Sequence, residues 1–261
     1  MAFCNKHYSK DIIMSSVNLK SDVKLNSLAL QNYLSATGGF INISMSYVPY
    51  RHDWFYTEID VPNLTQIQDD FTQFFWKVLG NNLPDATGFY IVDQNTIDYP
   101  TSLNALKDYY NLSDRWCSVN FSVINNGAEF GGIHYDFVMG AEKYIALNIP
   151  LINCQGSYNV WYSGEPGDKT QISTYNNNTK VIVYANEDNA QAVDTTDTYW
   201  VTGHVEELER VECVKPMLVH VGRPHQPEVT HNNLRVLLSL RFRPELTDSE
   251  FDRIVNKSSV L

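Results

Sequence analysis

The sequence predicts a mainly β domain supported by a few helices. From residue 116 onward the chain breaks into short segments rich in β-branched and aromatic residues, separated by Gly, Pro, Asn and Asp, which is typical of antiparallel strands. Its 261 residues and 43% hydrophobic content suit one globular domain with a substantial core. We therefore expect a single domain over 1–261, made of a mixed support region at 1–115, a β core at 116–243 and a helix in 244–261.

Two helices are expected in the support region and one at the C-terminal end. Apolar residues recur at helical spacing through 64–79, directly after Asn63, which is a good helix-capping residue. A second helix is expected to start after Pro100 and to end near residue 112. Thr247 and Glu250 have the spacing of a capping box, which predicts the last helix.

Seven strands are expected in the β core, and several have one apolar and one polar face. They are 116–124, 131–137, 143–151, 157–164, 180–185, 216–221 and 234–242. Because strand side chains alternate, the first of them presents two different faces: Cys117, Val119, Phe121 and Val123 against Ser118, Asn120 and Ser122. We expect the apolar faces to pack on the helices and the polar faces to line a site.

Two segments, 164–180 and 186–197, have the composition of loops. They are low in aliphatic residues and rich in Asn, Asp, Gly and Thr. The sequence predicts that they are insertions at the rim of the β core. Either they cover a substrate as a lid, or they only decorate the surface.

The charge of the chain limits the partners it is expected to have. Thirty acidic residues face nineteen basic ones, a net charge of −11, which disfavours a broad electrostatic grip on nucleic acid or an anionic membrane. The first residues lack the apolar core of a secretory signal, and no apolar span is long enough for a membrane helix, so we expect an intracellular, cytoplasmic protein. Its four cysteines are widely scattered and are expected to be reduced thiols.

A histidine and a carboxylate lie two residues apart in the segment GGIHYDF. If this segment is a strand, His134 and Asp136 point to the same face and can share a metal ion. The alternative is a buried hydrogen bond in which the carboxylate only fixes the imidazole tautomer. A rival pair, His204 and Glu206, lies in a strongly charged stretch that is better explained as a solvated strand or turn.

The stretch 215–242 supplies candidates for the rest of a site. Among its histidines, His225 follows a Gly-Arg-Pro turn, His220 lies within an expected strand as its main competitor, and His231 stands between a threonine and two asparagines, where exposure is expected. In the strand 234–242, Arg235 and Arg241 share the polar face with Ser239. An inward arginine needs an anion, which is either a ligand or an internal Asp or Glu.

Together, His134-x-Asp136, a late His225 and Arg235 ten residues further on resemble the Fe(II)- and 2-oxoglutarate-dependent oxygenases of the prolyl-hydroxylase-like group. The resemblance covers 116–242, about half of the chain. It implies a double-stranded β-helix, or jelly-roll, core. It also implies site residues: Fe(II) ligands and catalytic residues His134, Asp136 and His225, and 2-oxoglutarate-binding residues Arg235, Ser239, Arg241, Asn120 and Asn148.

The implied activity is a dioxygenase that uses O2 and releases succinate and CO2 while hydroxylating a small molecule, an amino acid or a peptidyl side chain such as proline. Desaturation and cyclisation stay open. Two other classes remain as alternatives. One is a metal-free or zinc-bound jelly roll that binds a glycan through its Asn- and Tyr-rich segments, and the other is a cupin-type metalloenzyme that does not use 2-oxoglutarate. Arg235 discriminates among them, because neither alternative requires an inward arginine.

Overall fold

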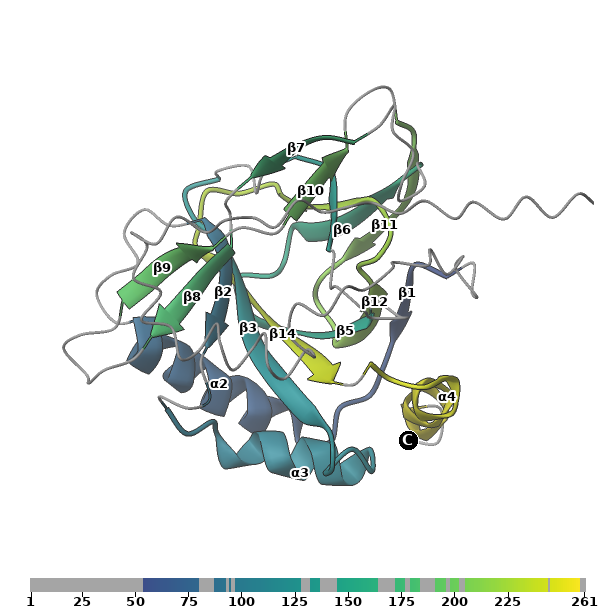
Figure 1. The fold of residues 1–261 in the computed structure, drawn as a ribbon. Coiled ribbons are helices and arrows are strands. Elements are labelled where there is room, and N and C mark those ends of the chain that lie inside the picture. The colour runs from purple at the N-terminus through teal and green to yellow at the C-terminus, as the bar shows by residue number, and fades with distance from the viewer. Residues whose placement is uncertain are drawn as a thin grey trace, which may run out of the picture.

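Two β-sheets and three helices make up the part of the chain that the computed structural model describes (Figure 1). The described residues are 54–79, 87–92, 94, 97–127, 132–136, 145–163, 172–176, 179–183, 191–195, 198–201, 205–243 and 245–258. For 135, 136 and the strand residues between 172 and 201, only the backbone is described. The expectation of a mainly β fold with supporting helices is confirmed.

The larger sheet has eight strands and contains both ends of the predicted β core. Its strands lie in the order β1 (Tyr56–Glu58), β12 (Met217–His220), β5 (Ile145–Ile152), β14 (Arg235–Arg243), β3 (Trp116–Ile124), β2 (Gly88–Val92), β8 (Thr179–Val183) and β9 (Gln191–Thr195). Neighbouring strands are antiparallel except for β2 and β8, which are parallel.

The smaller sheet has six strands, all paired antiparallel. Their order is β11 (Glu207–Glu212), β6 (Ser157–Tyr162), β13 (His225–Val229), β4 (His134–Asp136), β10 (Thr198–Val201) and β7 (Ile172–Asn176). From β3 to β6 and again from β11 to β14, successive strands alternate between the two sheets. Within the described residues the sheets do not close into a barrel.

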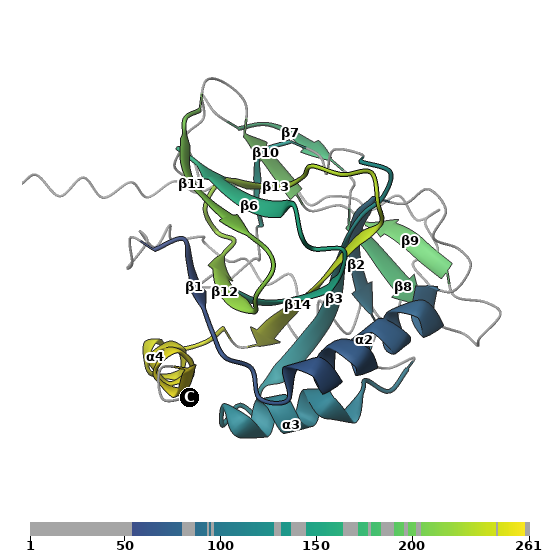
Figure 2. The same cartoon turned by 180° about the vertical axis from the view of Figure 1, so that it is seen from behind.

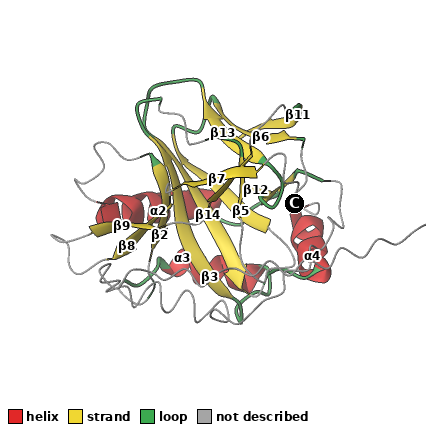
Figure 3. Ribbon diagram, turned by 45° about the horizontal axis from the view of Figure 1, so that its top comes forward, coloured by secondary structure: helices red, strands yellow, loops and turns green. Residues whose placement is uncertain are grey.

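The main hydrophobic core lies between the larger sheet and the helices α2 (Leu64–Leu79) and α3 (Thr101–Tyr109). Both helices lie along one face of this sheet, with the smaller sheet beyond its other face (Figures 2 and 3). Phe121 of β3 contacts Phe74 and Phe75 of α2, with ring centroids 6.3 and 5.1 Å apart. The expected apolar faces of the strands at 116–124, 143–151 and 234–242 belong to this core, so the prediction of their orientation is confirmed.

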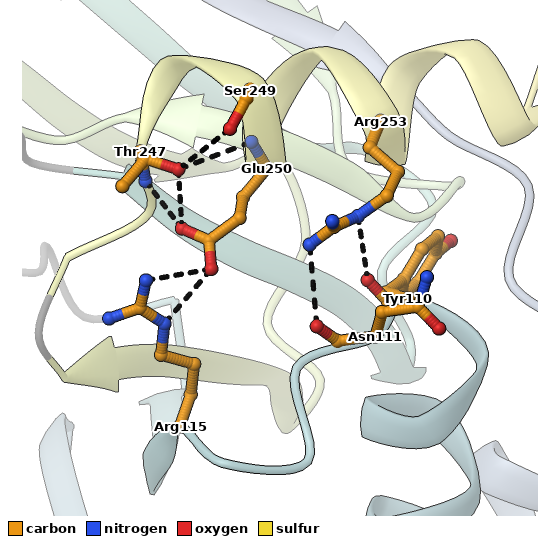
Figure 4. Close-up of polar contacts among 7 residues, drawn as sticks. All are labelled: Tyr110, Asn111, Arg115, Thr247, Ser249, Glu250 and Arg253. Atoms are coloured by element: carbon orange, nitrogen blue, oxygen red, sulfur yellow. Dashed lines mark hydrogen bonds and ion pairs between the residues drawn. The ribbon is translucent and has the colours of Figure 1, made fainter.

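The third helix, α4 (Asp248–Ser258), begins with the predicted capping box (Figure 4). The carboxylate of Glu250 accepts hydrogen bonds from the backbone N–H and the hydroxyl of Thr247, both at 2.7 Å. The same carboxylate forms an ion pair with Arg115 at 2.7 Å. Arg253, one turn later, donates to the backbone oxygens of Tyr110 and Asn111, so α4 is attached to the segment that links α3 to β3.

The loop prediction for 164–180 and 186–197 is wrong in part. Strands β7 and β9 lie within these segments, and β8 begins at Thr179. They form because each finds a neighbour elsewhere in the chain, β10 for β7 and β8 for β9, and such pairing is not visible in a polar composition. The remaining residues of both segments lie outside the described residues, so the choice between lid and decoration stays open.

Two more expectations concern membrane and thiol chemistry. No helix among the described residues is long and apolar enough to span a membrane. Three of the four cysteines, Cys117, Cys154 and Cys213, are buried free thiols, as expected. The fourth, Cys4, lies outside the described residues.

Candidate functional site

The structure places His134 and His225 side by side. They are direct partners in the register between β4 and β13, and their ring centroids are 4.5 Å apart. Both are buried, with 4% and 7% of their surface exposed. The next strand continues the row, because His225 is also opposite Trp161 of β6. Directly opposite residues point to the same face of a sheet, so these three side chains share one face.

Hydrogen bonds fix the tautomer of both imidazoles. Nδ1 of His134 lies 3.0 Å from the backbone oxygen of Gly132, and Nδ1 of His225 lies 2.9 Å from that of Arg223. A carbonyl oxygen only accepts hydrogen bonds, so each Nδ1 carries the proton when the ring is neutral. Nε2 then carries the lone pair on both rings. A backbone carbonyl behind the protonated nitrogen is the usual support of a metal-binding histidine.

The other histidines of the late stretch lie elsewhere. His220 is opposite Ile145 and therefore faces the helix side of the larger sheet, where its ring lies 5.3 Å from that of Trp54. His231 is partly exposed in the turn before β14, and its Nε2 donates to the backbone oxygen of Asn153 at 2.9 Å. Of the three, His225 is the one beside His134. In the rival pair, Glu206 is exposed and His204 lies outside the described residues.

Asp136 occupies the expected position in the backbone. It is the last residue of β4, two residues after His134, and is paired with Thr198 of β10. Its side chain is outside the description. The side chains that are described form no group of three potential metal ligands, so the triad of His134, Asp136 and His225 stays a prediction.

Arg235 is completely buried and held by two serines, one from each sheet. Its Nε donates to Oγ of Ser157 in β6 at 2.9 Å. Its Nη1 donates to Oγ and to the backbone oxygen of Ser122 in β3, at 2.8 and 3.2 Å. These bonds define the plane of the guanidinium. Neither serine was expected from the sequence as a partner of Arg235. Ser239, which was expected to bind the co-substrate together with Arg235, lies four residues, or roughly 13 Å, further along β14.

The remaining nitrogen of this guanidinium, Nη2, is buried and has no hydrogen-bond partner among the described residues. No described Asp or Glu forms an ion pair with Arg235. Burial raises the pKa of the neighbouring Cys213 and Cys154 thiols, although the positive charge of Arg235 and, for Cys213, a hydrogen bond with this arginine act in the opposite direction. The N–H groups of Nη2 can therefore donate hydrogen bonds to an anion.

The other expected 2-oxoglutarate contacts differ in how much of their hydrogen-bonding capacity is in use. Asn120 is engaged within its own sheet: its amide donates to the backbone oxygens of Ser239 and Ser118 and accepts from the hydroxyl of Ser118. Asn148 is buried, and its Oδ1 has no partner among the described residues. Arg241 is buried near the other end of β14, with its guanidinium 5.6 Å from the ring of Phe89.

Comparisons with protein-family models, with curated proteins and with solved structures gave no match. The arrangement offers two imidazole nitrogens at one level and a buried guanidinium at another. From Ser157, which bonds Arg235, to Trp161, which is opposite His225, β6 advances by four residues, or roughly 13 Å.

Proposed function

We propose that this protein is an Fe(II)- and 2-oxoglutarate-dependent oxygenase, with His134, Asp136 and His225 as the metal ligands. The observation that carries this proposal is the pairing of His134 with His225, both with Nδ1 bonded to a backbone carbonyl. Two neutral imidazoles and a carboxylate suit a divalent iron ion and leave coordination positions for other ligands.

The topology supports a jelly-roll core for this site. Strands β3, β5, β12 and β14 are neighbours in the larger sheet, and β4, β6, β11 and β13 are neighbours in the smaller one. The chain alternates between these two groups of four, which is the pattern expected of a double-stranded β-helix. The strands β7 to β10 are inserted between β6 and β11 and extend both sheets at one edge.

Arg235 supports 2-oxoglutarate as the co-substrate. One carboxylate of this dianion would accept from Nη2 of Arg235, the buried nitrogen without a partner among the described residues. The levels of Ser157 and Trp161 are roughly 13 Å apart along β6, and the guanidinium of Arg235 already lies at the Ser157 level. The diacid and the metal ion would occupy this interval. The diacid would thus reach from the arginine to the histidine pair.

When bound, the iron would supply O2 activation coupled to the oxidative decarboxylation of 2-oxoglutarate. The overall reaction converts 2-oxoglutarate, O2 and a substrate C–H into succinate, CO2 and the corresponding alcohol. The protein's part is to hold Nε2 of both histidines in position and to keep the diacid anchored through Arg235. A small molecule or a peptidyl side chain is the proposed substrate class, because the net charge of −11 disfavours nucleic acid.

The test is anaerobic titration of the protein with Fe(II) and then with 2-oxoglutarate, followed by visible absorption. A charge-transfer band that needs both additions supports the proposal. His225→Ala should lose it, whereas His220→Ala is the matched control that should keep it, because His220 faces the helix side. Metal binding without any response to 2-oxoglutarate would favour the cupin-type metalloenzyme instead. Absence of metal binding would overturn the proposal.

A further inference from the structure

Asn159 of β6 lies in the section between the histidine pair and Arg235. Every second residue of a strand points to the same face, so Ser157, Asn159 and Trp161 share one face of β6. This face points toward the larger sheet, because Ser157 accepts a hydrogen bond from Arg235 of β14. Trp161 belongs to a cluster of packed apolar side chains that also contains Ala146 of β5. Asn159 lies midway between Ser157, which contacts Arg235, and Trp161, which packs with Ala146.

Asn148 occupies the corresponding position on the larger sheet. Asn148 follows Ala146 by two residues on β5, so both point to the same face. A short turn around Cys154 joins β5 to β6. Strands that leave the same turn in two facing sheets place residues at similar distances from that turn opposite each other. Asn148 and Asn159 therefore face the same section of the interior from opposite sides.

Neither amide is used by the described part of the protein. Both residues are buried, with 6% of their surface exposed. Oδ1 of Asn148 is buried without a hydrogen-bond partner among the described residues, and the side chain of Asn159 has no hydrogen bond to a described residue. Asn120, also inward, shows the contrast, since its amide is fully engaged by the sheet. Burying an unpaired amide costs free energy, so two of them at one level indicate a ligand that completes their hydrogen bonds.

We infer that Asn159, opposite Asn148, is a further co-substrate-binding residue that holds the oxo-acid half of 2-oxoglutarate. This inference rests on the proposed function. Arg235 takes the far carboxylate, and the oxygens nearer the histidines then lie at the level of the two amides. A carboxamide presents its amino group to such oxygens after rotation about its last side-chain bond. Asn159 thereby completes, from the smaller sheet, a site that Arg235 and Asn148 form on the larger one.

Binding and stability should respond to a substitution of Asn159 with opposite signs. Asn159→Leu removes the unpaired amide at nearly constant size, so the melting temperature of the ligand-free protein should rise or stay level. Its dissociation constant for 2-oxoglutarate, titrated anaerobically with Fe(II), should weaken about tenfold or more. Asn148→Leu should behave in the same way. A residue with a purely structural role would instead lower the melting temperature.

Tyr158→Phe is the matched control, because Tyr158 is next to Asn159 on β6 but faces outward, with Arg210 over its ring at 5.4 Å. It should leave 2-oxoglutarate binding unchanged. If the unaltered protein binds 2-oxoglutarate and Asn159→Leu binds it equally well, the role of Asn159 is refuted while the proposed function stands. If the unaltered protein does not bind 2-oxoglutarate at all, the proposed function and this inference fall together.

Discussion

Replacing Arg235 by lysine tests the anchor on which the proposed co-substrate depends. Arg235 donates three hydrogen bonds to Ser122 and Ser157 and keeps Nη2 for the ligand. A lysine has one ammonium group with three hydrogens and no planar fork. It can bond the serines or approach the diacid, but it cannot do both in the geometry that the guanidinium provides.

The expected loss follows from this geometry. Breaking a charge-assisted hydrogen bond at a completely buried position costs roughly 2–5 kcal/mol, so Arg235→Lys should weaken 2-oxoglutarate binding about 30-fold or more. Metal binding should be nearly unchanged, because the histidine pair is at a different level of the sheets. The assay is the dependence of succinate formation on 2-oxoglutarate concentration, with metal content measured on the same samples.

Arg241→Lys is the control for this prediction. Arg241 lies on the same strand and the same face as Arg235, six residues or roughly 20 Å further along, and it is also buried. The half-saturating 2-oxoglutarate concentration should stay within about twofold of the unaltered value. If Arg235→Lys leaves the dependence on 2-oxoglutarate unchanged, the co-substrate is not held by Arg235. If only Arg241→Lys alters it, Arg241 is the anchor.

Three further outcomes follow from the contacts. Ser157→Ala should raise the KM for 2-oxoglutarate about three- to tenfold with kcat unchanged, and Ser157→Thr should restore it, because the hydroxyl only orients Arg235. Glu250→Gln should lower the free energy of unfolding by about 1–2 kcal/mol in urea titrations, with exposed Asp252→Asn as the neutral control on the same helix. Burial raises the pKa of Glu245 to about 7 in spite of Arg243. Between its ordinary value of 4.5 and 7 the folded protein holds a proton that the unfolded chain has lost, so stability should fall as pH rises through this range, and Glu245→Gln should remove that slope in thermal melts.

The pKa of Glu250 has the opposite sign. Burial pushes it up, but hydrogen bonds from Thr247 and Arg115 outweigh this and hold it below the ordinary value. The stabilisation from this carboxylate is therefore present above pH 4.5 and is lost as pH falls through the lower, folded-state pKa. Comparing the pH dependence of both single variants separates the two carboxylates, because their effects on the slope are opposite.

The elements that could be predicted from sequence are those whose pattern is local. From Cys117 to Val123 the sequence alternates strictly between apolar and polar residues, and β3 has the expected bounds 116–124. The capping box at Thr247 and Glu250 needs only two residues three apart, and both of its hydrogen bonds form. The row of His134 and His225 was predicted only through the family resemblance, since nothing in the alternation of either strand brings them together.

The elements that were missed depend on pairing between distant segments. Strands β1 and β2 come from the support region, yet they join the larger sheet beside β12 and β3. Strand β13 contains Pro227, which normally argues against a strand. Asn159 lies in one of the Asn- and Tyr-rich segments that favour the glycan-binding alternative, so the sequence alone gives it no role in binding 2-oxoglutarate. The alternation of Ser157, Asn159 and Trp161 was the available signal, but only the buried neighbour Arg235 shows which face is inward.

The two faces of the larger sheet explain how this protein can carry unsatisfied polar groups in its interior. Every side chain of β14 that points toward the helices is apolar and completely or almost completely buried. This face of the sheet supplies the hydrophobic stabilisation. On the opposite face, Arg235 and Asn148 each keep one buried atom without a described partner. Each such atom costs about 1–3 kcal/mol, which packing alone would select against. Buried polar atoms without hydrogen-bond partners are expected mainly at functional sites. In this protein such atoms belong to Arg235 and Asn148, in the region between the histidine pair and the buried guanidinium.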